Sequence, residues 1–309
     1  MNSKFDVPLL LIIFNRPEET SIVFETIRKI QPTKLFISGD GPRLGNSNDE
    51  AKIVETRNLV LNNIDWDCEC LTNFSEQNLG CGRSVSNGIS WFFENVPFGI
   101  ILEDDCSPQI DFFNYAKELL IKYENDLNIW HISGNSIVNQ NVFKRRDISS
   151  YYYSNFNHVW GWATWANRWK YYDFKLSNIN ETNFIKERFS LVKDIEFWEN
   201  LFFKMKNSEI DTWDYQWTFA MWYNNGISIV PKINLIENIG FGENATHTLL
   251  APNFSTTSFS LSQIVHPSEI IINTKADNYV MRKIFVLSFV NRLKIKLSIL
   301  IKNISEIFR

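Results

Sequence analysis

The chain is poor in the residues that build disulfide scaffolds and zinc centres. Its 309 residues include only four Cys and four His. The cysteines, Cys68, Cys70, Cys81 and Cys106, form no Cys-x-x-Cys pair, and histidine is too sparse to complete a zinc site. Reduced thiols in a cytosolic protein are therefore the simplest interpretation.

Signatures of a membrane protein or of a well-known enzyme class are also missing. No uncharged apolar run reaches about 18 residues, so no transmembrane helix is expected. The apolar stretch 7–14 is short and lacks a small-residue cleavage site, which favours a buried strand over a signal peptide. The P-loop, Rossmann, hydrolase-elbow and zincin patterns do not occur, which argues against those classes.

Positive charge is not in excess over the whole chain. The net charge of −4 argues against a nucleic-acid partner. Lys and Arg gather instead at the end, in residues 282–309, where apolar residues recur at near-helical spacing. We predict that 281–309 form a basic amphipathic helix on an anionic membrane surface, at the inner face of the cytoplasmic membrane. A helix packed against the rest of the chain or a protein partner is the alternative.

What the sequence does contain is a regular alternation of apolar strands and helices. Hydrophobic residues make up 44% of the chain, which is enough for a large core. The alternation predicts an α/β fold with a mostly parallel central sheet and helices on both faces. Strands are expected at 8–14, 34–38, 65–72, 98–102 and 129–133, with helices at 17–29, 50–62, 111–123 and after the loop 78–82.

The second half of the chain has a mixed pattern and is expected to cap the rim of the first. We divide the chain at 1–135, 136–280 and 281–309, with the first two parts sharing one core. Within 136–280 a Trp-rich run spans 160–172. Strands are expected at 150–156, 227–230 and 235–237, and helices near 183–189, 195–205 and 214–224.

Three adjacent acids, Glu103, Asp104 and Asp105, follow a wholly apolar strand. Adjacent carboxylates repel one another, and partial burial at a strand end makes their ionisation costlier. Carboxylate oxygens are the ligands of hard cations such as Mg²⁺ and Mn²⁺, which commonly hold phosphate as well. The pattern therefore predicts a metal and diphosphate site in an enzyme that uses a nucleotide-activated substrate. A solvated acidic turn that caps the next helix is the alternative.

Other polar residues are expected at the same edge, because ligands bind at the carboxyl ends of parallel strands. Arg16 and Arg43 are candidates to meet a diphosphate, although each could be a solvated surface residue. Asp40 could accept a hydrogen bond from a base N–H or simply form an Asp-Gly turn. The segment 133–135 falls at another such strand end.

Two candidates lie further along the chain. Asp214 stands beside Trp213, and partial desolvation there would raise its pKa towards that of a useful general base. A helix N-cap is the alternative interpretation, and the two roles are not exclusive. His247, in the glycine-containing loop 238–248, could contact a phosphate or the metal ion, or be structural.

The Trp-rich run offers flat surfaces for sugar rings. Indole faces stack on the C–H faces of sugars, but Trp also fills protein cores. We expect most of these Trp side chains to be core. Trp160, Trp162 and Trp213 are the candidates for the acceptor side of a site.

Taken in order from Pro8 to about Thr248, these motifs resemble those of GT-A glycosyltransferases, and among them the inverting N-acetylglucosaminyltransferase I type. Ile101-Leu102-Glu103-Asp104-Asp105 is similar to the E-D-D form of the family's D-x-D motif, in which the last Asp binds Mn²⁺. Further resemblances lie at 10–16, 37–41, 160–162, 213–214 and 240–247.

The resemblance implies a GT-A fold and a role for each candidate. Asp105 would bind Mn²⁺ or Mg²⁺, while Glu103 and Asp104 orient the ribose and the surroundings of the metal. Arg16 and His247 would offset phosphate charge. Asp40 would contact the uracil, and Asp214 would be the catalytic base.

The implied activity is inverting, metal-dependent transfer of a sugar from a UDP-sugar, with UDP-GlcNAc as the first choice. The acceptor would be a hydroxyl of a glycan or lipid-linked saccharide in bacterial surface polysaccharide synthesis. Residues 1–135 would bind the nucleotide sugar and 136–280 the acceptor. Two other classes stay open. A sugar-nucleotide nucleotidyltransferase would want a Gly-rich, Lys-containing loop at 14–17, and a non-catalytic carbohydrate-binding protein would not need the acidic strand end.

Overall fold

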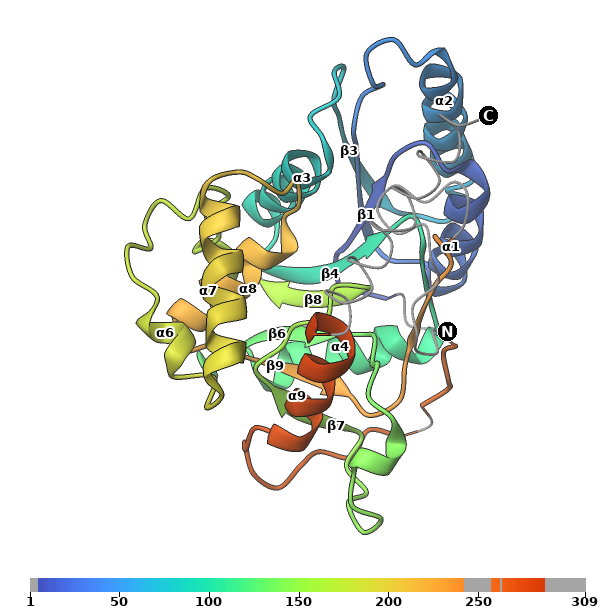
Figure 1. Cartoon of the computed structure of the whole chain (residues 1–309). Helices are drawn as coiled ribbons and strands as arrows, with labels where there is room; N and C mark the ends of the chain where they lie inside the picture. Colours follow the sequence, from blue (N-terminus) through green and yellow to red (C-terminus); the bar gives the residue numbers. More distant parts are fainter. Residues whose placement is uncertain (1–4, 242–256, 262, 287–309) are drawn as a thin grey trace, which may run out of the picture.

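The computed structural model describes residues 5–241, 257–261 and 263–286 (Figure 1). Its centre is an eight-stranded sheet that runs through both halves of the chain. The strands, in order across the sheet, are β3 (Glu69–Phe74), β2 (Lys34–Gly39), β1 (Leu9–Ile13), β4 (Phe98–Glu103), β8 (Trp162–Trp165), β6 (Ile129–Ser133), β9 (Ile227–Pro231) and β7 (Tyr151–Ser154).

The first half of the sheet is parallel, as the strand–helix alternation predicts. β1 pairs in parallel with β2 and β4, and β2 pairs in parallel with β3. Every residue of β1 is buried, which explains its unbroken apolar sequence. Since Ile12 is in register with Glu103, the segment after β1 emerges beside the three acids at the end of β4.

Helices cover both faces of the sheet. Alternate residues of a strand pack against the helices of one face and then of the other. Leu11 packs in one core cluster with Phe24, whereas Ile12 packs in the other with Ile89. The first layer contains α1 (Pro17–Ile30), α2 (Ser47–Asn62) and α4 (Ile110–Lys122), and the second contains α3 (Cys81–Asn95), α7 (Val192–Lys206) and α8 (Asp214–Tyr223). The predicted α/β fold with helices on both faces is confirmed.

The sheet continues into the second half through β8, a strand that the sequence patterns did not predict. β8 lies antiparallel to both β4 and β6, and it carries part of the Trp-rich run. Its alternation is that of a strand buried on both faces, since Trp162 packs in one core cluster and Ala163 in the other. β6 and β9 pair in parallel, and β7 closes the edge antiparallel to β9.

The start of β3 differs from the expected position. The strand begins at Glu69 rather than near residue 65. The preceding residues make other contacts, because Asp65 pairs with Arg28 of α1 and the Trp66 indole donates to the Pro32 carbonyl at 2.9 Å. These contacts hold residues 65 and 66 against α1 and the segment that connects it to β2.

No helix in the described part of the chain is long and apolar enough to span a bilayer. Of the predicted tail, only the π-helix Met281–Val286 is described, and 287–309 and His247 lie outside the described residues.

The remaining elements are short. They are β5 (Cys106–Pro108) paired with β10 (Ile236–Asn238), α5 (Ala166–Trp169), α6 (Asn183–Lys186), α9 (Thr274–Val280) and the 3-10 turn Gln140–Val142.

Candidate functional site

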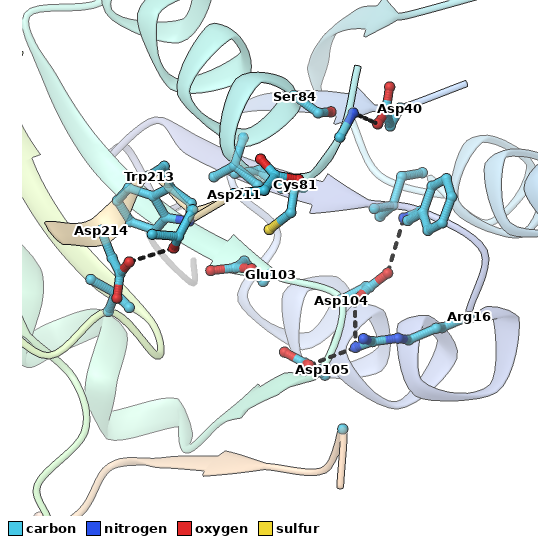
Figure 2. A pocket seen from close by; sticks show the side chains of 18 of the residues that line it. Arg16, Asp40, Cys81, Ser84, Glu103, Asp104, Asp105, Asp211, Trp213 and Asp214 are labelled. Carbon is cyan, nitrogen blue, oxygen red and sulfur yellow. Dashed lines mark hydrogen bonds and ion pairs between the residues drawn. The ribbon is translucent and has the colours of Figure 1, made fainter. Parts of the chain in front are cut away.

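A cavity of about 460 Å³ lies at the carboxyl ends of β1, β2 and β4 (Figure 2). This volume is within the range of small-molecule sites. Carboxylates outnumber cations in its described lining by six to two, so the cavity itself favours cations. The charged residues are Arg16, Asp40, Arg43, Glu103, Asp104, Asp105, Asp211 and Asp214.

The acids after β4 are held by Arg16 and by the end of β1. Arg16 Nη1 lies 2.6 Å from Asp105 Oδ2 and 3.4 Å from Asp104 Oδ1. The backbone N–H of Phe14 donates to Asp104 Oδ2 at 2.9 Å. Burial raises the pKa of Asp104 to about 7, although the charge of Arg16 and the Phe14 hydrogen bond oppose this.

Glu103 is the acid of this cluster most affected by burial and by the neighbouring carboxylates. Burial raises its pKa well above the usual range, and the negative charges of Asp105, Asp104 and Asp214 raise it further. Figure 2 shows the Glu103 carboxylate on the side of the acidic cluster that faces Asp214. A divalent cation would offset this repulsion, as the sequence predicts.

The donor set fits a metal ion that shares its coordination with a substrate. Within the described ranges, no three or more His, Cys, Asp or Glu side chains are grouped to hold a metal by themselves. Mg²⁺ at phosphate sites commonly takes one or two carboxylates and fills its shell with phosphate oxygens and water. Asp105 as a single protein ligand therefore fits a diphosphate-bound cation.

Asp40 holds the segment before α3 in place. Its carboxylate accepts backbone hydrogen bonds from Gly41, Leu79 and Gly80, and a side-chain hydrogen bond from Asn78. A carboxylate has about four lone-pair sites, so this loop uses most of its capacity. The predicted contact with a base stays a prediction, but the acceptor role of Asp40 within the chain is clear.

Arg43 lines the cavity while paired with a buried acid. Its Nε and Nη2 atoms lie 2.6 Å and 2.8 Å from the two oxygens of Asp49. Asn15 Nδ2 donates to the same carboxylate at 2.8 Å. These contacts hold the pKa of Asp49 at about 2, chiefly through the Arg43 hydrogen bond.

The Asp49 contacts predict an acid-dependent loss of stability. The folded pKa is depressed, so the stabilisation is complete above the unfolded pKa near 4 and is lost as the pH falls towards 2. We expect Asp49→Asn to lower the free energy of unfolding by about 1 kcal/mol at pH 7, because Arg43 is half exposed and screened. The difference should shrink to near zero at about pH 2. Urea unfolding at both pH values tests this, with exposed Glu50→Gln as the matched control; a constant difference would contradict it.

Asp214 begins α8 and is held by its neighbour Thr212. Thr212 Oγ1 donates to Asp214 Oδ1 at 2.5 Å. The N-cap position belongs to Trp213, whose side chain makes no cap hydrogen bond, so the N-cap interpretation of Asp214 is wrong. As the first residue of the helix, its carboxylate is still favoured by the helix dipole.

The predicted acceptor-side Trp residues separate into different environments. Trp160 lines the cavity, and its ring meets Phe241 at 5.7 Å between centroids. Trp213 is buried but also lines the cavity. Trp162 is fully buried and stacks between His131 and Trp213, so its predicted acceptor-side position is corrected to the core.

Sequence reasoning missed Asp211, which connects the two halves of the site. Asp211 Oδ1 accepts from the backbone N–H of Gly82 at 2.9 Å, in the first turn of α3. A Cβ on Gly82 would lie 2.7 Å from the same oxygen, so glycine permits this approach. The only signals in the sequence were the Gly-x-Gly at 80–82 and an acid three residues before Asp214.

Comparison with known proteins does not assign a family. No family model and no curated protein matches the chain. Among solved structures, the chain is similar to S. aureus TarS 1–349, at 11% identity and TM-score 0.38 over 73% of this chain and 58% of that one. It is similar to UDP-glucose pyrophosphorylase complexed with UDP-glucose, at 8% identity and TM-score 0.28 over 48% of this chain and 62% of that one.

A third similar structure is the inositol-1-phosphate CTP transferase from T. maritima, at 8% identity and TM-score 0.34 over 74% of this chain and 86% of that one. The chain spans less than two thirds of the first two structures. With identities and TM-scores this low, the similarities carry no argument about activity. An assignment of activity therefore rests on the sheet and on the residues that line the cavity.

Proposed function

We propose that this chain is an inverting, metal-dependent glycosyltransferase of the GT-A type. It would move a sugar from a UDP-sugar, with UDP-GlcNAc as the first donor to test, to a hydroxyl of a glycan or lipid-linked saccharide. The observation that supports this most is the cavity at the strand ends, where six carboxylates face two guanidinium groups. A diphosphate would be repelled there unless a divalent cation accompanied it.

The chain's own residues divide the work between two sides of the cavity. Arg16, already beside Asp104 and Asp105, provides positive charge where the leaving diphosphate would accumulate negative charge. Mn²⁺ or Mg²⁺ bound through Asp105 would supply Lewis-acid stabilisation of that leaving group. Asp214, on the other side, would take the proton of the acceptor hydroxyl.

The alternatives receive less support. A nucleotidyltransferase would need a flexible, cationic loop after β1, but α1 begins at Pro17 immediately after Phe14-Asn15-Arg16. A carbohydrate-binding protein without catalysis would have no use for Asp214 facing a crowded acidic strand end. We also propose that the chain acts in bacterial surface polysaccharide synthesis and that 282–309 contact the cytoplasmic membrane.

A screen of nucleotide sugars tests the proposal directly. The purified chain would be incubated with UDP-, GDP-, CMP- and dTDP-sugars, with Mn²⁺ or with a chelator, and the release of free nucleotide would be measured. We expect metal-dependent release of UDP from a UDP-sugar. Release of pyrophosphate from a nucleoside triphosphate and a sugar phosphate would instead indicate a nucleotidyltransferase.

Gly240 gives a more local prediction. A Cβ at this position would lie 2.2 Å from Asp105 Oδ2 and 2.8 Å from Asp105 Cβ. We expect Gly240→Ala to push Asp105 away from Arg16 and to weaken metal-dependent UDP binding by on the order of tenfold, about 1.4 kcal/mol. Calorimetry of UDP binding with Mn²⁺ measures this.

Gly45→Ala is the matched control for Gly240→Ala. Gly45 has a φ of +78° and nothing within 4 Å of its Cβ direction. Alanine there should cost about 1 kcal/mol of stability through backbone strain, but leave UDP binding unchanged. Normal metal-dependent binding by Gly240→Ala would contradict the proposed place of Asp105.

A further inference from the structure

A second cavity, of about 190 Å³, adjoins the first through Asp214. Val159, Trp160 and Asp214 line both cavities. Its volume is below the range of about 300–1,000 Å³ that suits drug-sized ligands, so it matches a single small ring rather than a nucleotide. Any group bound in it would lie next to the proposed base.

Long-range contacts around β6 shape the polar end of this cavity. The backbone N–H of Gly134 donates to the Gly161 carbonyl at 2.7 Å, and that of His158 donates to Ser133 Oγ at 3.0 Å. These bonds bring the segment after β6 against the segment before β8. Asn135 and His158 consequently line the same cavity.

Three of the residues that line the second cavity hold buried polar atoms without partners in the described part of the chain. These atoms are Asn135 Oδ1, His158 Nε2 and Trp198 Nε1. These residues are 4%, 9% and 1% exposed. An unsatisfied buried polar atom costs about 1–3 kcal/mol, so side-chain movements that turn these atoms towards the cavity would be favoured by bound water or by a ligand with several hydroxyl groups. Asn Oδ1 accepts, indole N–H donates, and the imidazole nitrogen does either according to its tautomer.

The other walls of the second cavity are largely aromatic. Phe156 and Trp198 stack with 28° between their rings, and Phe285 packs on both. No Lys or Arg is found among the described lining residues, and Asp214 contributes a negative charge. Among the lining aromatics, Trp160, Tyr215 and Phe285 are only partly buried and can present ring surface to a sugar. The negative charge disfavours an anionic sugar or a phosphate.

We infer that the second cavity binds one neutral sugar ring of the acceptor and presents its hydroxyl to Asp214. The role of Asp214 in this inference rests on the proposed function, whereas the sugar-binding site rests on the cavity alone. The C-terminal segment forms part of the site, because Ile284 and Phe285 line it. In the transfer, the acceptor oxygen would bond to the sugar's anomeric carbon as the bond to UDP breaks, and its proton would pass to Asp214.

A variant that fills the second cavity tests the sugar site and leaves the proposed metal site unchanged. Ile284→Trp would occupy it, whereas Lys283→Trp adds the same side chain at an exposed neighbouring position outside its lining. The probes are methyl glycosides of neutral sugars, with methyl glucuronide as an anionic counterpart. We expect Ile284→Trp to raise the acceptor KM by on the order of tenfold or more, with UDP binding in Mn²⁺ unchanged and Lys283→Trp like the unaltered chain. Unimpaired transfer by Ile284→Trp would overturn the inference.

A binding measurement separates this inference from the proposed function. The indole N–H signal of Trp198, assigned with Trp198→Phe, would be followed by NMR while each glycoside is added to tens of millimolar. A saturable shift with neutral glycosides only, absent in Ile284→Trp, supports the sugar site even if no UDP binds. No shift with any neutral glycoside would overturn the site and leave water as its occupant.

Discussion

Asp214→Asn should lose about 10²–10⁴-fold in turnover and still bind UDP with unchanged affinity in Mn²⁺. Asparagine cannot accept the acceptor's proton, yet its Oδ1 can still accept the hydrogen bond that Thr212 donates at 2.5 Å. The geometry at the start of α8 should therefore survive. Initial rates with a UDP-sugar and an accepted glycoside, alongside calorimetry of UDP, measure both effects.

Two further variants show whether Asp214 acts as a positioned base. Thr212→Ala should lower kcat by about tenfold without changing UDP affinity, and Thr212→Ser should restore it by keeping the hydroxyl. Asp173→Asn, at a turn outside the lining of both cavities, is the control. Normal turnover by Asp214→Asn would remove Asp214 as the base.

Asp105→Ala should abolish the dependence of UDP binding on divalent metal. The variant removes the one carboxylate to which we assign the ion, and it removes the partner that Arg16 contacts at 2.6 Å. We expect UDP affinity in Mn²⁺ to fall to the level measured with a chelator, a loss of about 100-fold, or roughly 2.7 kcal/mol. Titration of UDP under both conditions measures this.

Asp65→Ala is a matched control for Asp105→Ala. Asp65 is also paired with an arginine of the first half, Arg28, but on the surface and outside the cavity. The two variants change the net charge equally and each leaves a guanidinium without one partner. Full metal-dependent UDP binding by Asp105→Ala would assign the ion to another residue.

The first half of the fold was predictable because its signals are local. An unbroken apolar run gives β1, Pro17 with Glu18 and Glu19 gives the start of α1, and three acids mark the end of β4. Parallel pairing then places the ends of β1, β2 and β4 together without further information. The cavity that these ends line was expected for this reason.

The second half was less predictable because its contacts join distant segments. The Trp-rich run gave no period that distinguished a central strand from a surface for sugars, and only pairing with β4 and β6 reveals β8. Asp211 contacts Gly82 across 129 residues of sequence. The second cavity likewise gathers Asn135, Trp198 and Phe285, which no local pattern connects.

The most direct test of the central claim is calorimetric titration of UDP into the unaltered chain, first with Mn²⁺ and then with a chelator in place of the metal. The account predicts saturable binding at one site with Mn²⁺, and loss of that binding with the chelator. Equal affinity under the two conditions, or no binding with Mn²⁺ present, would contradict it.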